Sequence, residues 1–452
     1  MMQDERIKFL NTKKEKNGDY VLYWMQASQR TEYNHALEYS IIKANSLKKP
    51  IVVFFGLTEK FPNANTRNFS FMLEGLYEIG KSLNDIGIKF VIQNISPEIG
   101  ATEMSNDASL VIVDKGYQRI ERHWRNYVAN NIGCPLIEIE TNTVIPVEEI
   151  STKEEYAAAT IRPKIKKLLD QYTVHVDSIE SIKSSLSMDF GSLDIDDPEE
   201  LLKSLKIDNS VGKAPSLFGG TSEAKSHLDM FIKKKLDRYD DLRNNPNLDY
   251  LSNMSPYLHF GQISPLHITL KILQSESPGK ESYLEELIVR RELSMNYVYY
   301  NPNYDSYDGV PDWCKRTLEF HEKDPREYIY SLKELENANT HDPYWNAAQK
   351  EMVYTGKMHG YMRMYWGKRV IEWSKSPKDA YEILIYLNDK YELDGRDANG
   401  YTGVAWCFGK HDRPWAERKI FGNIRYMNDK GLKRKFDPDA YAKKINDYST
   451  NT

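Results

Sequence analysis

Short apolar stretches rich in β-branched and aromatic residues recur along the first third of the chain, and helix-like stretches separate them. The apolar stretches cover residues 21–24, 51–57, 89–92, 110–113 and 135–139. This alternation is typical of a parallel α/β sheet. We therefore expect an α/β N-terminal domain with a parallel, Rossmann-like sheet over residues 18–145. Neither GxGxxG after the first stretch nor GxxxxGK[ST] anywhere occurs, so the sequence does not support a dinucleotide or P-loop site there.

The rest of the chain has a different character. With 452 residues it exceeds what one hydrophobic core usually serves, which predicts a second domain. Between residues 178 and 225 the composition shifts to Ser, Asp, Gly and Lys, so we expect a loop-like, partly ordered connection and assign residues 146–220 to an interdomain linker. Thr221 or Ser222, followed by Glu223, predicts a helix N-cap. From there the sequence favours helix, which predicts an all-α C-terminal domain over residues 221–448.

Bulk properties exclude several classes of protein. The three cysteines lie far apart without CxxC spacing, and the ten histidines form no ligand cluster, so neither a disulfide framework nor a metal site is supported. The first residues are charged and no run of 18 apolar residues follows, which argues against a signal peptide or a membrane span. We therefore expect an intracellular protein.

Positive charge gathers near the end of the chain although the net charge is −5. Residues 410–435 contain nine Lys or Arg against three acids, with Trp415, Phe421, Tyr426 and Phe436 interleaved. Such a segment can attract phosphates. A solvated surface face is an equally good explanation of the charges, and the interleaved aromatics favour nucleic acid modestly.

Five of the eight tryptophans fall between residues 341 and 415: Trp345, Trp366, Trp373, Trp406 and Trp415. The simplest interpretation is an aromatic core. Trp366 and Trp373 are seven residues apart, so on a helix they share a face about 10 Å apart along the axis. The alternative is that these tryptophans are oxidisable residues around a redox cofactor, but their spacing alone favours core packing over electron transfer.

Two polar loops are candidate ligand sites. LSNMSPYL places small hydroxyl and amide side chains before a proline, a composition suited to holding phosphate but equally to an ordinary turn and helix cap. DGRDANG packs charges and glycines into seven residues. An EF-hand frame anchored on Asp397, Asn399 and Gly400 would need Glu at 406, where Trp stands, so calcium is not expected.

Longer strings resemble one family. GKMHGYMRMYWGKRVIEW (356–373), LNDKYELDGRDANGYTGVAW (387–406) and HDRPWAERKIFGNIRYMNDKGLKRKFD (411–437) are similar to the C-terminal half of class II cyclobutane pyrimidine dimer photolyases, in the photolyase/cryptochrome superfamily. LRNNPNLDYLSNMSPYLHFGQIS (242–264), EELIVRRELSMNYVYYNP (285–302), THDPYWNAAQ (340–349), EYAAATIRPK (155–164) and VLYWMQASQR (21–30) extend the resemblance over most of the chain. It implies a helical FAD-binding domain and an α/β domain that can hold an antenna pigment, a deazaflavin or a folate.

The resemblance also implies cofactor contacts. The LSNMS loop would hold the flavin's phosphates, Arg363 and Asp394 would form an ion pair beside the ring, and Asn388 would lie near flavin N5. A fixed arginine favours negative charge on a reduced ring, and a neutral amide can donate or accept. Each residue could instead be a satisfied structural polar group. The implied cofactor residues are Tyr239, Ser252, Asn253, Met254, Ser255, Arg363, Asn388, Asp394 and Arg396.

The resemblance implies a second group of residues, which would bind the DNA lesion. Trp406 and Met364 would form apolar walls against a flipped-out dimer, and Glu286, as a neutral acid in an apolar pocket, would donate a hydrogen bond to it. Pairing of Glu286 with Arg290 on the same helix is the alternative. Some relatives carry an aromatic residue where Arg290 stands, so the wall of the lesion pocket is less well defined. One residue is missing near positions 409–410 relative to longer family members, so the register of the DNA-facing loop is less well defined too. Arg243 is implied to fill the gap that the flipped lesion leaves in the duplex, although a plain phosphate contact or a surface ion pair is nearly as good an explanation for it. The implied DNA contacts are Arg243, Glu286, Arg290, Met364, Trp406, Arg413, Trp415 and Arg425.

Trp366, Trp345 and Trp373 match the family's electron-transfer chain, with Trp366 nearest the flavin and Trp373 at the surface. The expected function is light-driven repair of cyclobutane pyrimidine dimers in ultraviolet-damaged double-stranded DNA, in the cytoplasm or another compartment that contains DNA. A cryptochrome-like photoreceptor without repair activity is the alternative, and a colourless nucleic-acid-binding protein the third. We expect a monomer with no membrane partner.

Overall fold

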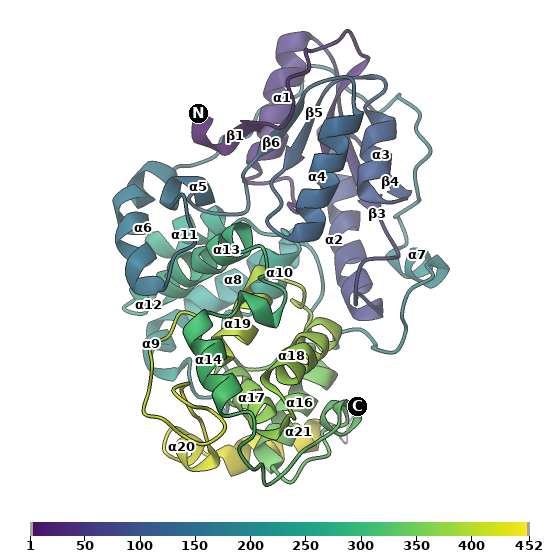
Figure 1. Ribbon diagram of the computed structural model, residues 1–452. Helices are drawn as coiled ribbons and strands as arrows, with labels where there is room; N and C mark the ends of the chain where they lie inside the picture. Colours follow the sequence, from purple (N-terminus) through teal and green to yellow (C-terminus); the bar gives the residue numbers. More distant parts are fainter. Residues whose placement is uncertain (1–2, 450–452) are drawn as a thin grey trace.

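An α/β domain stacks on a helical domain in the structure, a computed structural model that describes residues 3–449 (Figure 1). The N-terminal domain contains a six-stranded sheet within the described residues. Its strands are β1 (Ile7–Phe9), β2 (Tyr20–Trp24), β3 (Ile51–Leu57), β4 (Lys89–Asn94), β5 (Ala108–Asp114) and β6 (Leu136–Ile139). The five predicted strands are thus confirmed, with ends that differ by two residues or fewer.

The strand order is β1-β6-β5-β2-β3-β4. Strands β2 to β6 pair in parallel, as predicted, whereas β1 pairs antiparallel with β6. The sequence analysis missed β1, because three residues with two exposed side chains give no apolar run. The chain leaves β2 toward β3 on one side and β5 toward β6 on the other, so the connections diverge between β2 and β5. Open α/β sheets bind ligands at such a point, beyond the carboxyl ends of the strands.

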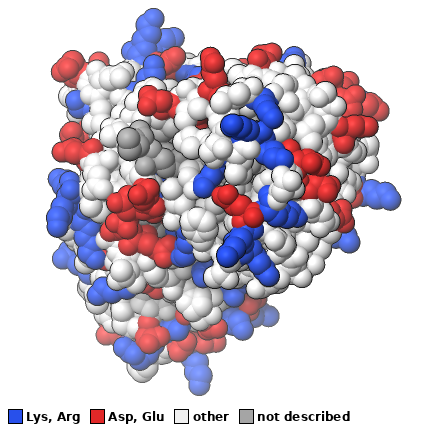
Figure 2. All heavy atoms as spheres, turned by 90° about the horizontal axis from the view of Figure 1, so that it is seen from above, with Lys and Arg blue, Asp and Glu red and all other residues white. Residues whose placement is uncertain are grey.

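Alternate side chains of the strands enter two separate cores. On one face, Val21, Tyr23 and Val53 pack against α1 (His35–Leu47) and α2 (Thr66–Asp85). On the other face, Leu22 and Trp24 pack against α3 (Pro97–Met104) and α4 (Arg119–Asn131). Burial of both faces explains why these strands are continuous apolar runs in the sequence. Over this end of the molecule, Lys and Arg are interspersed with Asp and Glu (Figure 2).

Residues 146–220 contain more regular structure than their composition suggests. They include α5 (Val147–Ile150), α6 (Ala158–Tyr172) and α7 (Pro198–Ser204). The stretch between α6 and α7 runs along β4: Leu193 N donates to Ile92 O at 2.7 Å and Ser185 N donates to Gly87 O at 3.0 Å. The expectation of a partly ordered connection is therefore wrong for this stretch, because its backbone groups find partners on the sheet.

The second domain is helical, as predicted, with cores between its helices. Its first helix begins after Gly220, which has φ 123°, so neither Thr221 nor Ser222 is the N-cap that the sequence suggested. None of the helices in residues 3–449 is both long and apolar enough to cross a membrane. The helices are α8 (Thr221–Lys234), α9 (Tyr239–Leu242), α10 (Ser255–His259), α11 (Pro265–Leu273), α12 (Lys280–Leu284), α13 (Arg291–Tyr300), α14 (Asp312–Phe320), α15 (Leu332–Glu336), α16 (Pro343–Thr355), α17 (Gly360–Trp373), α18 (Pro377–Tyr391), α19 (Ala398–Cys407), α20 (Asp429–Lys433) and α21 (Pro438–Ser449).

A buried carboxyl group joins the two domains and predicts a pH effect. Glu292 on α13 accepts hydrogen bonds from Val144 N at 2.5 Å and Ile145 N at 3.2 Å, and its Oε2 atom has no hydrogen-bond partner within residues 3–449. Burial raises its pKa from 4.5 to about 8, against the effect of the two N–H groups. The folded state therefore binds a proton more tightly than the unfolded state, and this contribution to stability, complete below pH 4.5, is lost as the pH rises through about 8.

We expect Glu292→Gln to flatten the decline of stability across this range, because an amide does not ionise. Urea unfolding at pH values on both sides of the range measures the effect. Glu5→Gln, at an exposed carboxyl group, is the control and should keep the slope of the parent protein. An equally steep decline in Glu292→Gln would assign the pH effect to other groups.

Candidate functional site

Three tryptophans on α16 and α17 form a continuous stack. The rings of Trp345 and Trp366 lie nearly parallel with centroids 6.5 Å apart, and those of Trp345 and Trp373 meet edge to face at 5.6 Å. Trp345 Nε1 donates to Trp366 O at 3.0 Å, and Trp366 Nε1 donates to Gln349 Oε1 at 2.9 Å. Asp342 fixes the start of α16 by accepting from two backbone N–H groups. Trp345 lies between the other two rings, as the resemblance implied, and the role of the three in electron transfer stays a prediction.

The predicted exposure of Trp373 is wrong. Only 2% of this residue is accessible, compared with 0% for Trp345 and 2% for Trp366. Trp373 is covered because the rings of Tyr330 and His341 contact it, each with a centroid separation of 5.3 Å. The stack therefore continues beyond Trp373 before it meets solvent.

The LSNMS loop leads into α10 in an unusual backbone conformation. Asn253 has φ 56°, which favours a loop that turns its N–H groups inward, and Met254 is buried. Lys357 Nζ donates to Ser255 Oγ at 2.8 Å. Tyr239 is 6% exposed and lies edge to face with Tyr283 at 5.4 Å. Lys357 was not expected at this site; its place in the string GKMHG, among apolar helices, is the signal that could have indicated it.

A buried cluster of charged residues lies beside this loop, and its ion pair differs from the one expected. Arg363 Nη2 pairs with Glu392 Oε1 at 3.0 Å, so the predicted partner Asp394 is not its direct one. Burial raises the pKa of Glu392, and Arg363 opposes that effect. Burial alone would also raise the pKa of Asp394, but the Lys357 and Arg363 cations hold it at about 2. Asp394 is thus an anion in a field of two cations.

Several atoms of this cluster have no hydrogen-bond partner among the described residues: Arg363 Nε, Glu392 Oε2, Asp394 Oδ1 and His359 Nε2. Buried polar atoms normally have partners, so this set is suited to a polar ligand. Burial lowers the pKa of His359 to about 4, so its ring is neutral. Flavin rings and phosphates offer both donors and acceptors. The residues present therefore fit the FAD group that the resemblance implies.

Asn388 and Arg396 both hydrogen-bond to Asp389. Asn388 is 3% exposed and donates through Nδ2 to Asp389 Oδ1 at 3.1 Å, while Arg396 N donates to the same oxygen at 2.8 Å. The Arg396 guanidinium donates to the Asp389 carbonyl and, at 3.3 Å, to the carbonyl of Asn63 in the α/β domain. The Arg396 side chain thus reaches the domain interface.

Two of the residues expected at the lesion, Glu286 and Arg290, lie on a π-helical turn, Glu285–Arg290, between α12 and α13. Glu286 on this turn pairs with Arg243 at 2.8 Å, with side chains 38% and 26% exposed. Neither the apolar surroundings expected for Glu286 nor its pairing with Arg290 is found. A π-helical turn rotates side chains out of regular α-helical positions and is frequent at functional sites.

Arg290 connects this turn with Trp406 on α19. Its Nε atom lies 3.2 Å from Glu285 Oε1, and its guanidinium lies 5.8 Å from the Trp406 ring centroid. Trp406 is only partly buried. Met364 on α17 is also partly buried and packs against the neighbouring core. Arg243 and Glu286 thus form one contact pair and Arg290 and Trp406 another, both at the π-helical turn, and Arg290 covers a face of the indole.

The basic segment forms an aromatic-cationic surface. Arg413 and Arg425 flank Trp415, with guanidinium-to-centroid distances of 5.6 and 5.3 Å, and Trp415 is 41% exposed. Trp415 and Arg425 line a surface hollow together with Arg418, Arg434 and Lys435. The three residues predicted from this segment are thus brought together.

The loop at residues 409–411, which is one residue shorter than in longer family members, contacts the segment just before α6. Gly409 and His411 have φ 102° and 61°. His411 Nδ1 lies 2.7 Å from Tyr156 O, and Lys410, 4% exposed, pairs with Glu154. Two left-handed residues and these contacts give the shortened loop a defined course.

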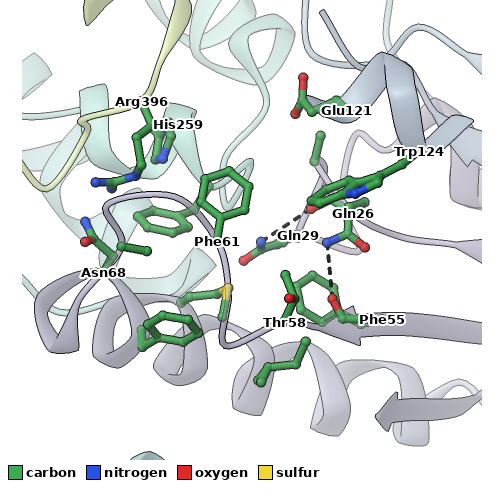
Figure 3. Close-up of a pocket in the computed structure, with 17 residues that line it drawn as sticks. Gln26, Gln29, Phe55, Thr58, Phe61, Asn68, Glu121, Trp124, His259 and Arg396 are labelled. Atoms are coloured by element: carbon green, nitrogen blue, oxygen red, sulfur yellow. Dashed lines mark hydrogen bonds between the residues drawn. The ribbon is translucent and has the colours of Figure 1, made fainter. Parts of the chain in front are cut away.

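A cavity of about 130 Å³ lies where the sheet connections diverge, between the two domains (Figure 3). Gln26 and Gln29 follow β2, Phe55 lies in β3 and Thr58 just after it, and Trp124 comes from α4. The helical domain contributes His259, Phe260 and Arg396. The loop after β2 is held by Asp114, whose Oδ2 accepts from the N–H groups of residues 26, 27 and 28 at 3.0, 2.9 and 2.8 Å. Sequence analysis did not find this cavity, because strand order creates it.

Comparison of sequences gives relatives of similar length. A family model described as DNA photolyase matches residues 21–182. A deoxyribodipyrimidine photo-lyase from Methanothermobacter thermautotrophicus is 52% identical, covering 98% of this chain and 99% of that protein. Enzymes of the same name from Arabidopsis thaliana and Potorous tridactylus are 41% and 38% identical, covering 93% and 94% of this chain and 88% and 81% of their own lengths. These relatives are consistent with the class II resemblance.

Solved structures share the fold at low sequence identity. An archaeal photolyase from Sulfolobus tokodaii with two FAD molecules has a TM-score of 0.72 at 17% identity, covering 94% of this chain and 89% of its own. A cryptochrome from Synechocystis has a TM-score of 0.73 at 14% identity, covering 94% and 88%. These likenesses concern the fold alone. With similar sequences over nearly its whole length and this fold, the chain belongs to the DNA photolyase family within the photolyase/cryptochrome superfamily.

Proposed function

We propose that the protein is a deoxyribodipyrimidine photo-lyase, a carbon–carbon lyase that uses light to repair cyclobutane pyrimidine dimers in DNA. The observation that carries this function is the near-full-length similarity to enzymes of that name. The site supports it, because buried unpaired polar atoms, an aromatic stack and a partly exposed indole surround one region of the helical domain.

When bound, reduced FAD absorbs blue or near-ultraviolet light and lends one electron to the dimer until both ring bonds have opened. The residues of the chain prepare that chemistry. Arg363 and Lys357 would place positive charge beside a reduced, anionic ring, while Glu392 pairs with the Arg363 guanidinium and Ser255 accepts from the Lys357 ammonium. Asn388 offers a neutral amide that can donate without supplying a full proton.

The lesion reaches the cofactor by flipping out of the duplex, which costs a few kcal/mol, less at a damaged step. Trp406 and Met364 supply apolar surface to the flipped dimer. In the free protein Glu286 is held by Arg243. If Arg243 enters the gap in the duplex, the Glu286 carboxyl group is released to hydrogen-bond the dimer. The ion pair thus links recognition of the gap to completion of the lesion pocket.

The basic segment supplies contacts to the DNA backbone. Each phosphate contact releases condensed counterions, which changes the slope of log K against log salt by about 1. We expect Arg425→Gln to weaken binding to damaged and undamaged duplexes alike and to reduce the magnitude of that slope by about 1. Filter binding across a salt series measures it. Lys203→Gln, at an exposed lysine on α7, is the control and should leave the slope unchanged. An unchanged slope in Arg425→Gln would remove this residue from the interface.

The interdomain cavity is the best candidate for an antenna pigment. The Sulfolobus tokodaii structure contains two FAD molecules and is titled for a novel light-harvesting cofactor. Here the cavity of about 130 Å³ is smaller than typical pockets for small molecules, about 300 Å³ or more, so Phe61 or Trp124 would have to move for a deazaflavin or a folate. Gln29 Oε1, a buried atom without a hydrogen-bond partner in the described part of the chain, would then accept a hydrogen bond from the pigment. We further expect a monomer that acts wherever damaged DNA is present.

The test is light-dependent repair by purified protein. Its absorption spectrum is recorded, the protein is reduced without oxygen, and the loss of thymine dimers from irradiated DNA is compared in light and darkness. Flavin bands with repair only in light are expected. Flavin without repair would overturn this function and favour a photoreceptor, and a colourless protein would make the tryptophan cluster a packing core.

A further inference from the structure

The aromatic contacts that begin at Trp366 extend past Trp373 to a tyrosine and a histidine. Tyr330 lies before α15 and His341 between α15 and α16. Both rings meet Trp373 edge to face at 5.3 Å. Tyr330 N also donates to the carbonyl of Trp373 at 3.3 Å, so the backbone fixes this contact. Trp366, Trp345, Trp373 and Tyr330 therefore form an unbroken sequence of neighbouring rings.

Tyr330 and His341 are joined by a hydrogen bond. Tyr330 OH and His341 Nδ1 are 2.7 Å apart, and the Tyr330 oxygen accepts from the backbone N–H of His341 at 3.0 Å. In the neutral ring with its proton on Nε2, Nδ1 is an acceptor, so the phenol donates to it. The Tyr328 ring stacks on His341 at 3.7 Å and 18°. Stacking on one side and the two hydrogen bonds fix the imidazole where a phenolic proton can pass to it.

Their surroundings favour movement of positive charge outward from Trp373. Trp373 is 2% exposed, and the Arg369 guanidinium, which pairs with Asp342, lies 5.6 Å from its ring centroid. A positive charge on a buried indole beside a guanidinium is unfavourable. Tyr330 lines a surface depression with Leu332, Ser374 and Tyr386, and His341 is exposed. Solvent can therefore stabilise a charge on the imidazole.

We propose that Tyr330, with His341 as its proton acceptor, is the terminal electron donor of the chain that reduces the cofactor. The inference rests on the proposed role of the three tryptophans. Trp366 gives an electron to light-excited oxidised FAD, Trp345 refills Trp366, and Trp373 refills Trp345. Tyr330 then gives an electron to Trp373 while its O–H proton passes to His341 Nδ1. Trp373 is restored, Tyr330 becomes a neutral phenoxyl radical and His341 becomes an imidazolium.

The cycle closes with a thiolate reductant from solution. The thiolate gives one electron to the Tyr330 oxygen, His341 returns the proton, and a thiyl radical leaves. Separation of the proton from the phenol makes return of the electron from the flavin to Tyr330 unfavourable until the proton comes back. The pair thus preserves the reduced cofactor long enough for the external reductant to act.

Another tyrosine competes with this assignment and provides a comparison. Tyr365 on α17 is fully buried, its OH donates to Asp342, and it accepts from Arg369 Nε at 3.1 Å. Tyr328 is a second comparison, because it lies parallel to Tyr330 at 6.2 Å and is 38% exposed. Phe at either position removes a nearby phenol while leaving Tyr330 and His341 in place.

The experiment is electron paramagnetic resonance of the FAD-loaded protein, illuminated with oxidised flavin and no added thiol. We expect a tyrosyl radical whose spectrum narrows with ring-deuterated tyrosine. Tyr330→Phe should lose this signal, while Tyr328→Phe and Tyr365→Phe keep it. His341→Gln retains a hydrogen-bond acceptor without a base, so the radical should form more slowly and its H₂O/D₂O rate ratio should fall toward unity.

The outcomes separate this inference from the proposals on which it rests. A tyrosyl signal that survives in Tyr330→Phe, or one lost only in Tyr365→Phe, overturns the assignment. A long-lived tryptophan radical in the parent protein without any tyrosyl radical also overturns it, although the tryptophan route stands. Unimpaired flavin reduction in Trp366→Phe would instead reject the route itself. FAD content, measured for each variant, identifies any that fail to fold.

Discussion

Trp366→Phe is expected to reduce photoreduction of oxidised flavin by more than about tenfold, which corresponds to about 1.4 kcal/mol or more in activation free energy. Phenylalanine preserves much of the packing but is far harder to oxidise. Trp366 stacks on Trp345 at 6.5 Å, and Trp345 alone connects it by ring contacts to Trp373 within the described residues. The rate of flavin reduction under steady light, with a thiol present, measures the effect.

Repair by Trp366→Phe protein that has been reduced chemically should continue, because the stack refills the cofactor and does not contact the dimer. Trp313→Phe is the matched control: Trp313 packs against the same helical core but lies outside the stack, so photoreduction should persist. If chemically reduced Trp366→Phe also failed to repair DNA, Trp366 would be a packing or pocket residue.

Gly261→Ala is expected to destabilise the protein by about 3 kcal/mol or more, with a fall in melting temperature of about 3 °C or more. Gly261 has φ 68°, and a Cβ atom there would lie 2.1 Å from the carbonyl oxygen of Ala27. Its own carbonyl accepts from Arg30 Nη1 at 2.8 Å. The clash is with backbone across the domain interface, so relief requires the domains to separate or the loop after β2 to move.

Thermal melting followed by fluorescence measures this change. Gly133→Ala is the control, since its Cβ atom would meet nothing within 4 Å, and it should stay within about 0.5 kcal/mol of the parent protein. A small effect of Gly261→Ala would mean that the interface is compliant at Ala27.

The strands were predictable because the local sequence determines them. Strands β3 and β5 are buried on both faces, so each is an uninterrupted apolar run. β1 was not predictable, since its pairing with β6 depends on residues about 130 positions away. The cavity between the domains depends likewise on strand order, which no local pattern encodes.

In the candidate site, too, some features were predictable from the sequence and others were not. The three tryptophan rings contact one another in the order that the resemblance implied, and Trp366 and Trp373 share one face of α17; their role in electron transfer stays a prediction. Partner choice was not predictable: Arg363 pairs with Glu392 rather than with the expected Asp394, and Glu286 pairs with Arg243, not with Arg290, the alternative partner considered for it. In each case two acids lie close together in the sequence, Glu392 with Asp394 and Glu285 with Glu286, and only the packing of the helices selects between them. The roles of these residues in binding FAD and DNA stay predictions.

The stretch between α6 and α7 has a consequence for the behaviour of the chain outside its native state. β4 is the last strand on its side of the sheet, and without this stretch the N–H groups of Lys89 and Ile92 would lose the Ser185 and Ser192 hydroxyls that they now bond at 2.8 and 3.0 Å. Uncovered edges invite pairing with other chains. A fragment ending at residue 182, where the family model stops matching, would therefore be prone to aggregate. During synthesis the β4 edge likewise stays open to pairing with other chains until residues 183–193 have emerged.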